Sequence, residues 1–170
     1  CLLGGCKRRE VAEPELADGP IAGGPQPELV VQSGSNHYVS DVEFSPDGRS
    51  IASAAGLQDL VVAVWDVEGQ RIRHALQHGA EVTGLAWSAD SKTLVTAATR
   101  EVVVWNAESG GRLGEIAVAP TGDGGRPLRF SPDGKLLAID GAGDTVHVYD
   151  AGTWSEAAKR PGGSLIGWDG

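Results

Sequence analysis

The sequence predicts an all-β protein made of about three repeated units, each a sheet of four antiparallel strands. The first observation is a turn motif, Phe-Ser-Pro-Asp-Gly or the variant Trp-Ser-Ala-Asp-Ser, which begins at Phe44, Trp87 and Phe130, at intervals of 43 residues. The second is an aromatic ring that closes a β-branched run, in Val-Trp-Asp, Val-Trp-Asn and Val-Tyr-Asp. These rings belong to Trp65, Trp105 and Tyr149. Two markers that recur in step predict a tandem repeat, and no segment shows the 3.6-residue period of an amphipathic helix.

Each unit contains short strand-forming runs separated by turn residues. In Ser-Pro-Asp-Gly, proline presets φ at the second position and glycine accepts a positive φ at the fourth, so the chain reverses there. The runs are mostly apolar and rich in β-branched residues, which favours strands. We expect strands at 39–44, 51–53, 60–65 and 71–76 in the first unit, at 82–87, 94–96, 102–105 and 112–118 in the second, and at 128–130, 136–138 and 145–149 in the third.

The chain divides into two regions of different composition. Residues 1–28 end in a stretch rich in Pro, Ala, Gly and Glu without a periodic pattern, so we expect a disordered tether there. Residues 29–170 carry the repeats. The approximate units are 35–76, 78–118 and 121–160, and residues 163–170, which contain Trp168, look like the start of another unit.

Charge and cysteine content narrow the function classes. The chain has 14 Lys and Arg against 23 Asp and Glu, which argues against a nucleic-acid partner because phosphate binding needs concentrated positive charge. Its two cysteines, Cys1 and Cys6, both precede the repeats, so the repeats offer no thiolate metal site. No segment has the roughly 18 apolar residues needed to span a bilayer.

The segment Leu3-Gly-Gly-Cys6 resembles a bacterial lipobox, in which small residues fit the signal peptidase and the cysteine thiol receives the lipid. On this interpretation Cys6 is the candidate lipidation site, the residues before it end a signal peptide, and the protein is anchored in the cell envelope, periplasmic or on the outer surface. The basic residues Lys7 to Arg9 depart from the pattern, because export disfavours positive charge after the cleavage site. The alternative is an incidental pair of cysteines at an arbitrary start, which leaves a cytoplasmic protein.

The two repeated motifs resemble those of the WD-repeat family over roughly residues 29–170. The resemblance implies a β-propeller, in which four-stranded blades pack around a central channel. Periplasmic propellers of the TolB type share the Ser-Pro-Asp-Gly turn, but the Val-Trp-Asp endings favour the WD type. Propellers close with four to eight blades, so about three blades plus the start of a fourth predict a partial propeller that belongs to a longer protein. A ring of several copies is the alternative.

The resemblance also implies a hydrogen-bonded set of His, Ser or Thr, Asp and Trp that stabilises each blade. In the first unit the matching residues are Ser53, Asp59 and Trp65, with Ser35 in the place of His. In the second they are His78, Thr96 and Trp105, with Thr99 in the place of Asp. In the third, Thr121, Ile139 and Tyr149 hold three places and Gly143 or Asp144 the fourth. No unit has the whole set, and all of these residues are expected to be structural.

The sequence contains no motif that indicates catalysis, neither GxxxxGK nor HExxH nor GxSxG. Asp140-Gly-Ala-Gly-Asp144 places two carboxylates around glycines, but a turn between strands explains it better than a calcium loop. Of the four histidines, His37, His74 and His147 are expected to be exposed, and none of the four has metal-ligand spacing. We therefore expect no catalytic residue, no metal and no cofactor.

These observations predict a non-catalytic scaffold that binds one or more protein partners, with membrane contact only through a lipid on Cys6. Three alternatives stay open. The chain could be a sensory or regulatory segment of a larger bacterial signalling protein, a TolB-like periplasmic propeller, or an enzyme whose propeller carries the chemistry.

Overall fold

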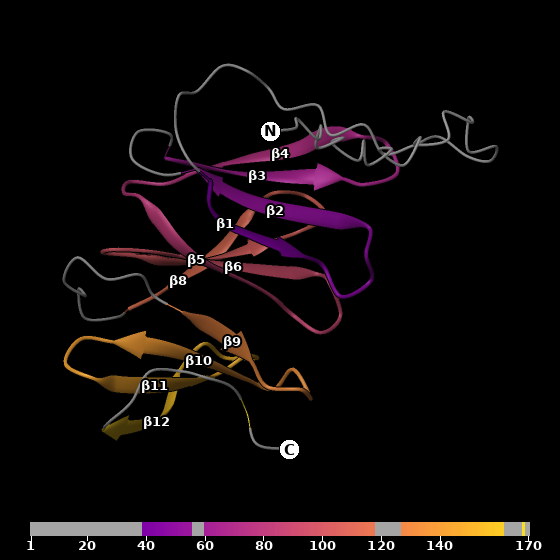
Figure 1. The fold of residues 1–170 in the computed structure, drawn as a ribbon. Helices are drawn as coiled ribbons and strands as arrows, with labels where there is room; N and C mark the ends of the chain where they lie inside the picture. Colours follow the sequence, from indigo (N-terminus) through magenta and orange to yellow (C-terminus); the bar gives the residue numbers. More distant parts are fainter. Residues whose placement is uncertain (1–38, 56–59, 118–126, 162–167, 169–170) are drawn as a thin grey trace, which may run out of the picture.

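The computed structural model describes residues 39–55, 60–117, 127–161 and 168 of the chain. The described residues form three four-stranded antiparallel sheets and no helix (Figure 1). The first sheet has the order β1 (Val39–Phe44), β2 (Ser50–Ala55), β3 (Val61–Asp66), β4 (Arg71–Gln77). The second has the order β5 (Val82–Trp87), β6 (Thr93–Ala98), β7 (Val102–Asn106), β8 (Arg112–Ile116). The third has the order β9 (Leu128–Phe130), β10 (Leu136–Gly141), β11 (Thr145–Asp150), β12 (Glu156–Pro161).

This arrangement confirms the all-β fold class and the three four-stranded blades expected from the 43-residue repeat. The aromatic markers also occupy equivalent places, because each lies on the third strand opposite an apolar residue of the second. The pairs are Trp65 with Ile51, Trp105 with Leu94 and Tyr149 with Leu137. The expectations for residues 1–28, including Cys6, and for Ser35, His37, Asp59 and Thr121 lie outside the described residues.

The repeated turn motif has a physical basis in its Ser and Asp side chains. Ser45 Oγ donates to Asp47 Oδ1 at 2.6 Å and accepts from the Ser50 amide at 2.9 Å, while Asp47 Oδ1 also accepts from the Arg49 amide at 3.0 Å. These hydrogen bonds hold the pKa of Asp47 below its ordinary value. The same contacts recur in the turns of the other two blades, around Ser88 and Ser131. The motif therefore closes the hairpin between the first two strands of every blade.

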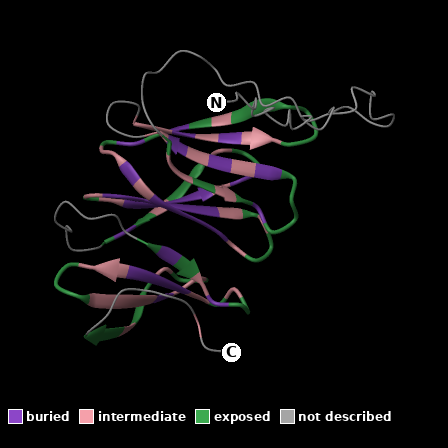
Figure 2. Cartoon of the chain, in the orientation of Figure 1, coloured by how far each residue is buried: buried purple, intermediate pink, exposed green. Residues whose placement is uncertain are grey.

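The blades pack face to face, and their innermost strands β1 and β5 lie side by side. Ser40 Oγ on β1 donates to the Val82 carbonyl at 3.0 Å, and Asp41 Oδ2 accepts from the Leu85 amide at 3.0 Å. Buried apolar side chains fill the space between the first and second sheets, and a second cluster fills the space between the second and third. Figure 2 shows that burial is most continuous in the middle sheet, which is covered on both faces.

The third blade differs from the other two in ways that the sequence analysis did not anticipate. A fourth strand was expected in this blade, but its position was not, because Glu-Ala-Ala-Lys-Arg-Pro contains residues that are depleted in strands. It nevertheless pairs with β11, with Arg160 opposite Val146. The equivalent positions of the first two blades are Leu76, opposite Val62, and Ile116, opposite Val102, and both are buried. The outer face of the third blade thus carries an exposed cation where the other blades carry core residues.

Candidate interaction site

The first two blades each contain a Trp that is fixed by a hydroxyl group on the neighbouring strand. Trp65 Nε1 donates to Ser53 Oγ at 2.9 Å, and Trp105 Nε1 donates to Thr96 Oγ1 at 2.9 Å. In each pair the Trp is the last but one residue of the third strand and the hydroxyl belongs to the second, so the bond joins the two middle strands of the blade. These residues therefore stabilise each blade internally.

The buried ring of His78 lies against this arrangement in the second blade. Its side chain is 0% exposed and meets the Trp105 ring edge to face, with 5.4 Å between the ring centroids. His78 Nδ1 lies 3.5 Å from Glu101 Oε1, too far for a hydrogen bond, and neither ring nitrogen has a hydrogen-bond partner. Burial lowers the pKa of His78, and the Glu101 carboxylate opposes this shift.

The acid that faces His78 is therefore Glu101, not a residue at the place of Thr99 that the family pattern indicated. Glu101 Oε1 also accepts from the Gly79 amide at 2.8 Å, which fixes the carboxylate beside the ring. Glu101 lies in the turn between β6 and β7, two residues after the position at which the family pattern places the acid. The sequence analysis, which relied on spacing, therefore did not identify Glu101.

The third blade replaces the Trp by Tyr149, and Ile139 fills the place of the hydroxyl residue. Tyr149 Oη donates to the Ala117 carbonyl of the second blade at 3.4 Å. His147 stacks on Tyr149 with 6.4 Å between centroids, and its Nδ1 lies 2.7 Å from Glu156 Oε1. His147 was expected to be exposed, but its side chain is only 12% exposed because Tyr149 and β12 cover it. These contacts are structural as well.

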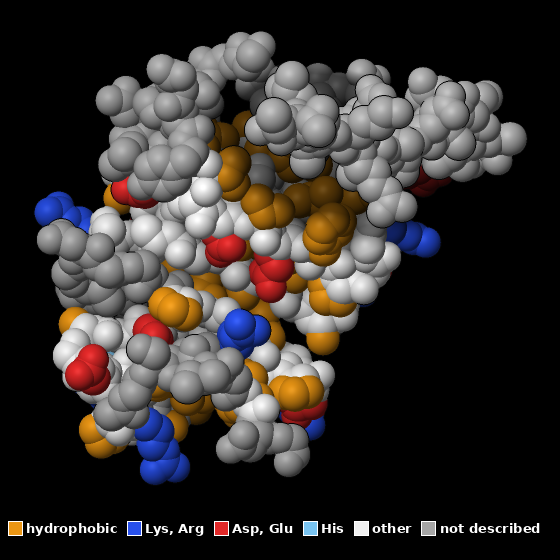
Figure 3. Space-filling view, in the orientation of Figure 1, with side chains coloured by type: hydrophobic (Ala, Val, Ile, Leu, Met, Phe, Trp, Pro, Cys, Tyr) orange, Lys and Arg blue, Asp and Glu red, His pale blue; other side chains and the backbone are white. Residues whose placement is uncertain are grey.

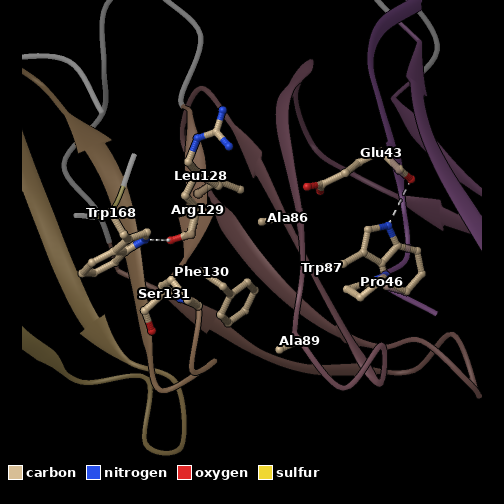
Figure 4. A pocket seen from close by; sticks show the side chains of 11 residues that line it. Glu43, Pro46, Ala86, Trp87, Ala89, Leu128, Arg129, Phe130, Ser131 and Trp168 are labelled. Atoms are coloured by element: carbon tan, nitrogen blue, oxygen red, sulfur yellow. Dashed lines mark hydrogen bonds between the residues drawn. The ribbon is translucent and has the colours of Figure 1, made fainter. Parts of the chain in front are cut away.

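The feature that faces outward is a pocket of about 370 Å³ where the innermost strands β1, β5 and β9 of the three blades meet; we call it the inner-strand pocket (Figure 4). Three aromatic rings line it, and turn residues that follow the strands form its edge. The lining residues are Glu43, Pro46, Ala86, Trp87, Ala89, Leu128, Arg129, Phe130, Ser131, Pro132 and Trp168. Nothing in a single repeat indicated this pocket, because each blade supplies only a few of its residues.

Glu43, Ala86 and Arg129 occupy the same position in the three repeats, directly before the aromatic residue of the turn motif. Figure 4 shows Glu43 and Arg129 extending from opposite walls, with the small side chain of Ala86 between them. Glu43 Oε2 is buried and has no hydrogen-bond partner. Burial, and then the nearby charge of Asp41, raise the pKa of Glu43 to about 7. Arg129, in contrast, is exposed to solvent.

Two indole rings close the pocket through equivalent hydrogen bonds. Trp87 Nε1 donates to the Glu43 carbonyl of the preceding blade at 3.2 Å, and Trp168 Nε1 donates to the Arg129 carbonyl at 3.4 Å (Figure 4). Trp168 thus contacts the third blade as Trp87 contacts the first. This is the contact that the expected further unit at 163–170 would make; of that unit only Trp168 lies within the described residues.

The outer face of β1 is a second surface of note. Val39, Val42 and Phe44 are 59%, 51% and 61% exposed. The residues that follow them by 43 positions, Val82, Leu85 and Trp87, are buried against the first blade at 2%, 4% and 5% exposure. Figure 3 shows hydrophobic side chains gathered over the region of β1 and β2. Apolar side chains on β1 are therefore exposed, whereas the equivalent side chains on β5 pack against the preceding blade.

Neither surface has the geometry of a metal centre. Within the described ranges, no group of three or more His, Cys, Asp and Glu side chains could hold a metal ion. Asp140 and Asp144 flank the hairpin between β10 and β11, as the sequence predicted. The described part of the chain also has no helix long and apolar enough to cross a membrane.

The fold and the repeated contacts define a partial β-propeller of WD type. Comparison with known proteins agrees, since the WD40 family model (WD domain, G-beta repeat) matches residues 27–66 and 69–106. These residues therefore carry repeats of the WD family. Its third blade, with Tyr149 in place of Trp, lies outside the matched residues.

Relatives and solved structures match only parts of larger proteins. The chain is 35% identical over 82 residues to the 66 kDa stress protein of Physarum polycephalum, covering 46% of this chain and 13% of that protein. It is 29% identical to the small ribosomal subunit protein RACK1 of Candida albicans, covering 71% of this chain and 39% of RACK1. The structure of U3-55K superposes with a TM-score of 0.67 at 22% identity, covering 76% of this chain and 41% of that one. The chain therefore spans less than half the length of each.

Proposed function

We propose that this chain is a non-catalytic scaffold that mediates protein–protein interaction. The observation that carries the proposal is the inner-strand pocket, which combines three aromatic rings, an acid and an exposed Arg at the meeting point of three blades. Trp and Arg side chains are enriched at the centres of protein interfaces, where they fill pockets on the partner. The hydrogen-bonded blades hold these residues on a rigid support, which is how repeat folds present binding residues.

The RACK1 relative supports the same class of function. Its name places it in the small ribosomal subunit, which is an assembly of many macromolecules. By analogy, this chain would act by positioning a partner protein rather than by chemistry on a substrate.

Site-specific cross-linking tests the scaffold function. A photoreactive phenylalanine analogue placed at Ala89, an exposed residue that lines the pocket, should cross-link a defined protein in cells. The matched control carries the analogue at Glu68, in the exposed turn between β3 and β4. The cross-linked protein is then purified and titrated against the 170-residue chain by calorimetry. Saturable binding by a protein that is captured only from position 89 supports the proposal, and identical capture from both positions contradicts it.

We also propose, from the sequence alone, that Cys6 is lipidated and anchors the protein in a cell envelope. Leu3-Gly-Gly-Cys6 carries this proposal. The relatives named above are eukaryotic and lend no support to a bacterial setting. The test expresses the protein from its native gene context with Cys6→Ser or, as the matched control, Cys1→Ser. Membrane partition that is lost only with Cys6→Ser supports the anchor; partition unchanged by Cys6→Ser refutes it and leaves the cytoplasmic location.

A further inference from the structure

The inner-strand pocket contains a carboxyl group, that of Glu43, with one unsatisfied oxygen atom; a backbone hydrogen bond from Trp87 only partly offsets the rise of its pKa on burial. Glu43 Oε2 is buried without a hydrogen-bond partner, and no ion pair joins Glu43 to a cation in the described part of the chain. An uncompensated buried carboxylate is costly, and such groups are normally paired or coordinated. The pocket would therefore gain from a ligand that brings a positive charge to Glu43.

The walls of the pocket select the shape of this cation. Both indole N–H groups that border it, those of Trp87 and Trp168, are already donated to backbone carbonyls. Phe130 and Trp168, which are partly exposed, therefore offer π-electron surfaces to a ligand rather than polar groups, whereas Trp87, at 5% exposure, contributes little accessible surface. A guanidinium group fits this environment best, because it is planar, stacks on aromatic faces and donates in a fork to a carboxylate.

The positive charge of Arg129 does not prevent a cation from binding at Glu43, because the Arg129 side chain is more exposed to solvent than that of Glu43. The Arg129 side chain is exposed and solvated, whereas Glu43 is partly buried in the opposite wall. Among the causes that shift the ionisation of Glu43, the charge of Arg129 is the smallest. The exposed Arg129 can instead meet a backbone carbonyl or a carboxylate that flanks the inserted side chain.

From this geometry we propose that the inner-strand pocket binds an arginine side chain of a partner polypeptide, with the guanidinium group on the Glu43 carboxylate. The proposal rests on the scaffold function above and names the chemistry of the partner. The aliphatic stem of the arginine would lie along the apolar residues of the pocket, Ala86 and Pro46, as long basic side chains do at apolar surfaces. A pocket of about 370 Å³ has room for one such side chain and its flanking backbone.

The five Trp residues provide the readout. In the ¹⁵N-labelled 170-residue chain, each indole N–H gives one signal. The probe is the capped peptide Gly-Gly-Arg-Gly-Gly, and its matched control replaces Arg by citrulline, which has nearly the same shape without the charge. The Arg peptide should shift the signals of Trp87 and Trp168 and leave those of Trp65 and Trp105, which are bonded within the blades. The citrulline peptide should bind about tenfold more weakly or worse, because the charge-assisted hydrogen bond is lost.

Variants locate the binding group. Glu43→Gln should weaken binding of the Arg peptide about tenfold or more, whereas Glu68→Gln, in an exposed turn, should leave it unchanged. The wild-type chain gives a second readout that needs no variant. Because Glu43 must be ionised to bind a cation and has a pKa of about 7, affinity should rise about tenfold from pH 6 to pH 8. Asp41 on the same strand and Arg129 on β9 are the other charged groups around Glu43.

Three results would overturn the proposal: equal binding of the Arg and citrulline peptides, unchanged binding by Glu43→Gln, or equal affinity at both pH values. The scaffold function is judged separately by the cross-linked partner. If that partner binds the wild-type chain and Glu43→Gln equally well, the arginine site is wrong and the scaffold function stands. If no partner is captured but the Arg peptide binds as described, the site stands and the cellular role does not.

Discussion

The bond between Trp105 and Thr96 offers a direct test of how much the side-chain contacts stabilise a blade. Thr96 is 0% exposed, and its hydroxyl accepts from Trp105 Nε1 at 2.9 Å and lies 3.4 Å from the Val103 carbonyl. Thr96→Val replaces the hydroxyl by a methyl group of similar size, so no cavity forms. The change leaves the indole N–H of a nearly buried ring without an acceptor. An unsatisfied buried donor costs about 1–3 kcal/mol, and we expect the free energy of unfolding to fall by that amount.

A double-mutant cycle isolates this bond from other effects of the substitution. Trp105→Phe removes the donor, so in that background Thr96→Val should cost less, with a coupling energy of at least about 0.5 kcal/mol. The comparison in the first blade is Ser53→Ala, where Trp65 is only partly buried and water can replace the lost acceptor. Its expected cost is smaller, about 0.5–1 kcal/mol.

Urea unfolding followed by far-ultraviolet circular dichroism measures all of these free energies without relying on Trp fluorescence. The slope of free energy against urea concentration should not change, because the substitutions leave the buried area nearly constant. Equal costs of Thr96→Val in the wild-type and Trp105→Phe backgrounds would refute the reasoning, since the loss would then have nothing to do with the indole donor.

Three further predictions follow from burial and backbone geometry. Because burial lowers the pKa of His78, the unfolded chain takes up the proton first as pH falls below about 6.5, so His78 reduces stability at acidic pH. Glu43, whose pKa is raised to about 7, adds stability over the same range in both chains, so the test is the difference between them. The free energy of unfolding of the wild type should fall relative to that of His78→Gln between pH 7.5 and 5.5, and a constant difference would contradict the burial effect. Val82→Ala should lower the free energy of unfolding, measured by chemical denaturation, by about 1–3 kcal/mol, because Val82 is buried. Val39→Ala, at the equivalent but exposed position of the first blade, should change it by less than about 0.5 kcal/mol. Equal costs of the two substitutions would mean that β1 is covered in solution. Gly110→Ala should be more destabilising in the same assay than Gly48→Ala. Both glycines have a positive φ, but only at Gly110 would the new Cβ meet a side chain, at 2.6 Å from His74 Nδ1. Equal effects of the two substitutions would show that this contact does not affect stability.

Local sequence patterns were sufficient to predict the blades. The Ser and Asp of each turn motif bond to each other and to the backbone within a few residues, so the motif specifies its own hairpin wherever it occurs. Trp65 and Trp105 likewise bond to residues 12 and 9 positions away, within one repeat. The period of 43 residues then places three copies of the same unit in order.

The inner-strand pocket could not be predicted in this way, because it is made by contacts between repeats. Glu43, Ala86 and Arg129 are unremarkable singly, and only their common position in the repeat shows that they face one space. Comparison of the residues directly before the aromatic residue of each turn motif would have indicated the inner-strand pocket. Glu101 was missed for a related reason, since turn length varies between blades and shifts the acid out of the expected place. The position of strand β12 was not predicted, because pairing with β11 outweighs the weak β propensity of its residues.

The uneven burial of the three sheets has a consequence for the order in which the array opens. All but one residue of β6 and of β7 are buried, whereas β11 in the third sheet has a single buried residue. In linear repeat arrays, stability is approximately a sum of each repeat's own contribution and its coupling to its neighbours, and the middle repeat has two neighbours. Amide hydrogens of the middle sheet should thus exchange with deuterium most slowly, while the outer sheets open first in separate, smaller cooperative steps. After each partial opening, the first and third blades would then refold against the second blade, which stays folded.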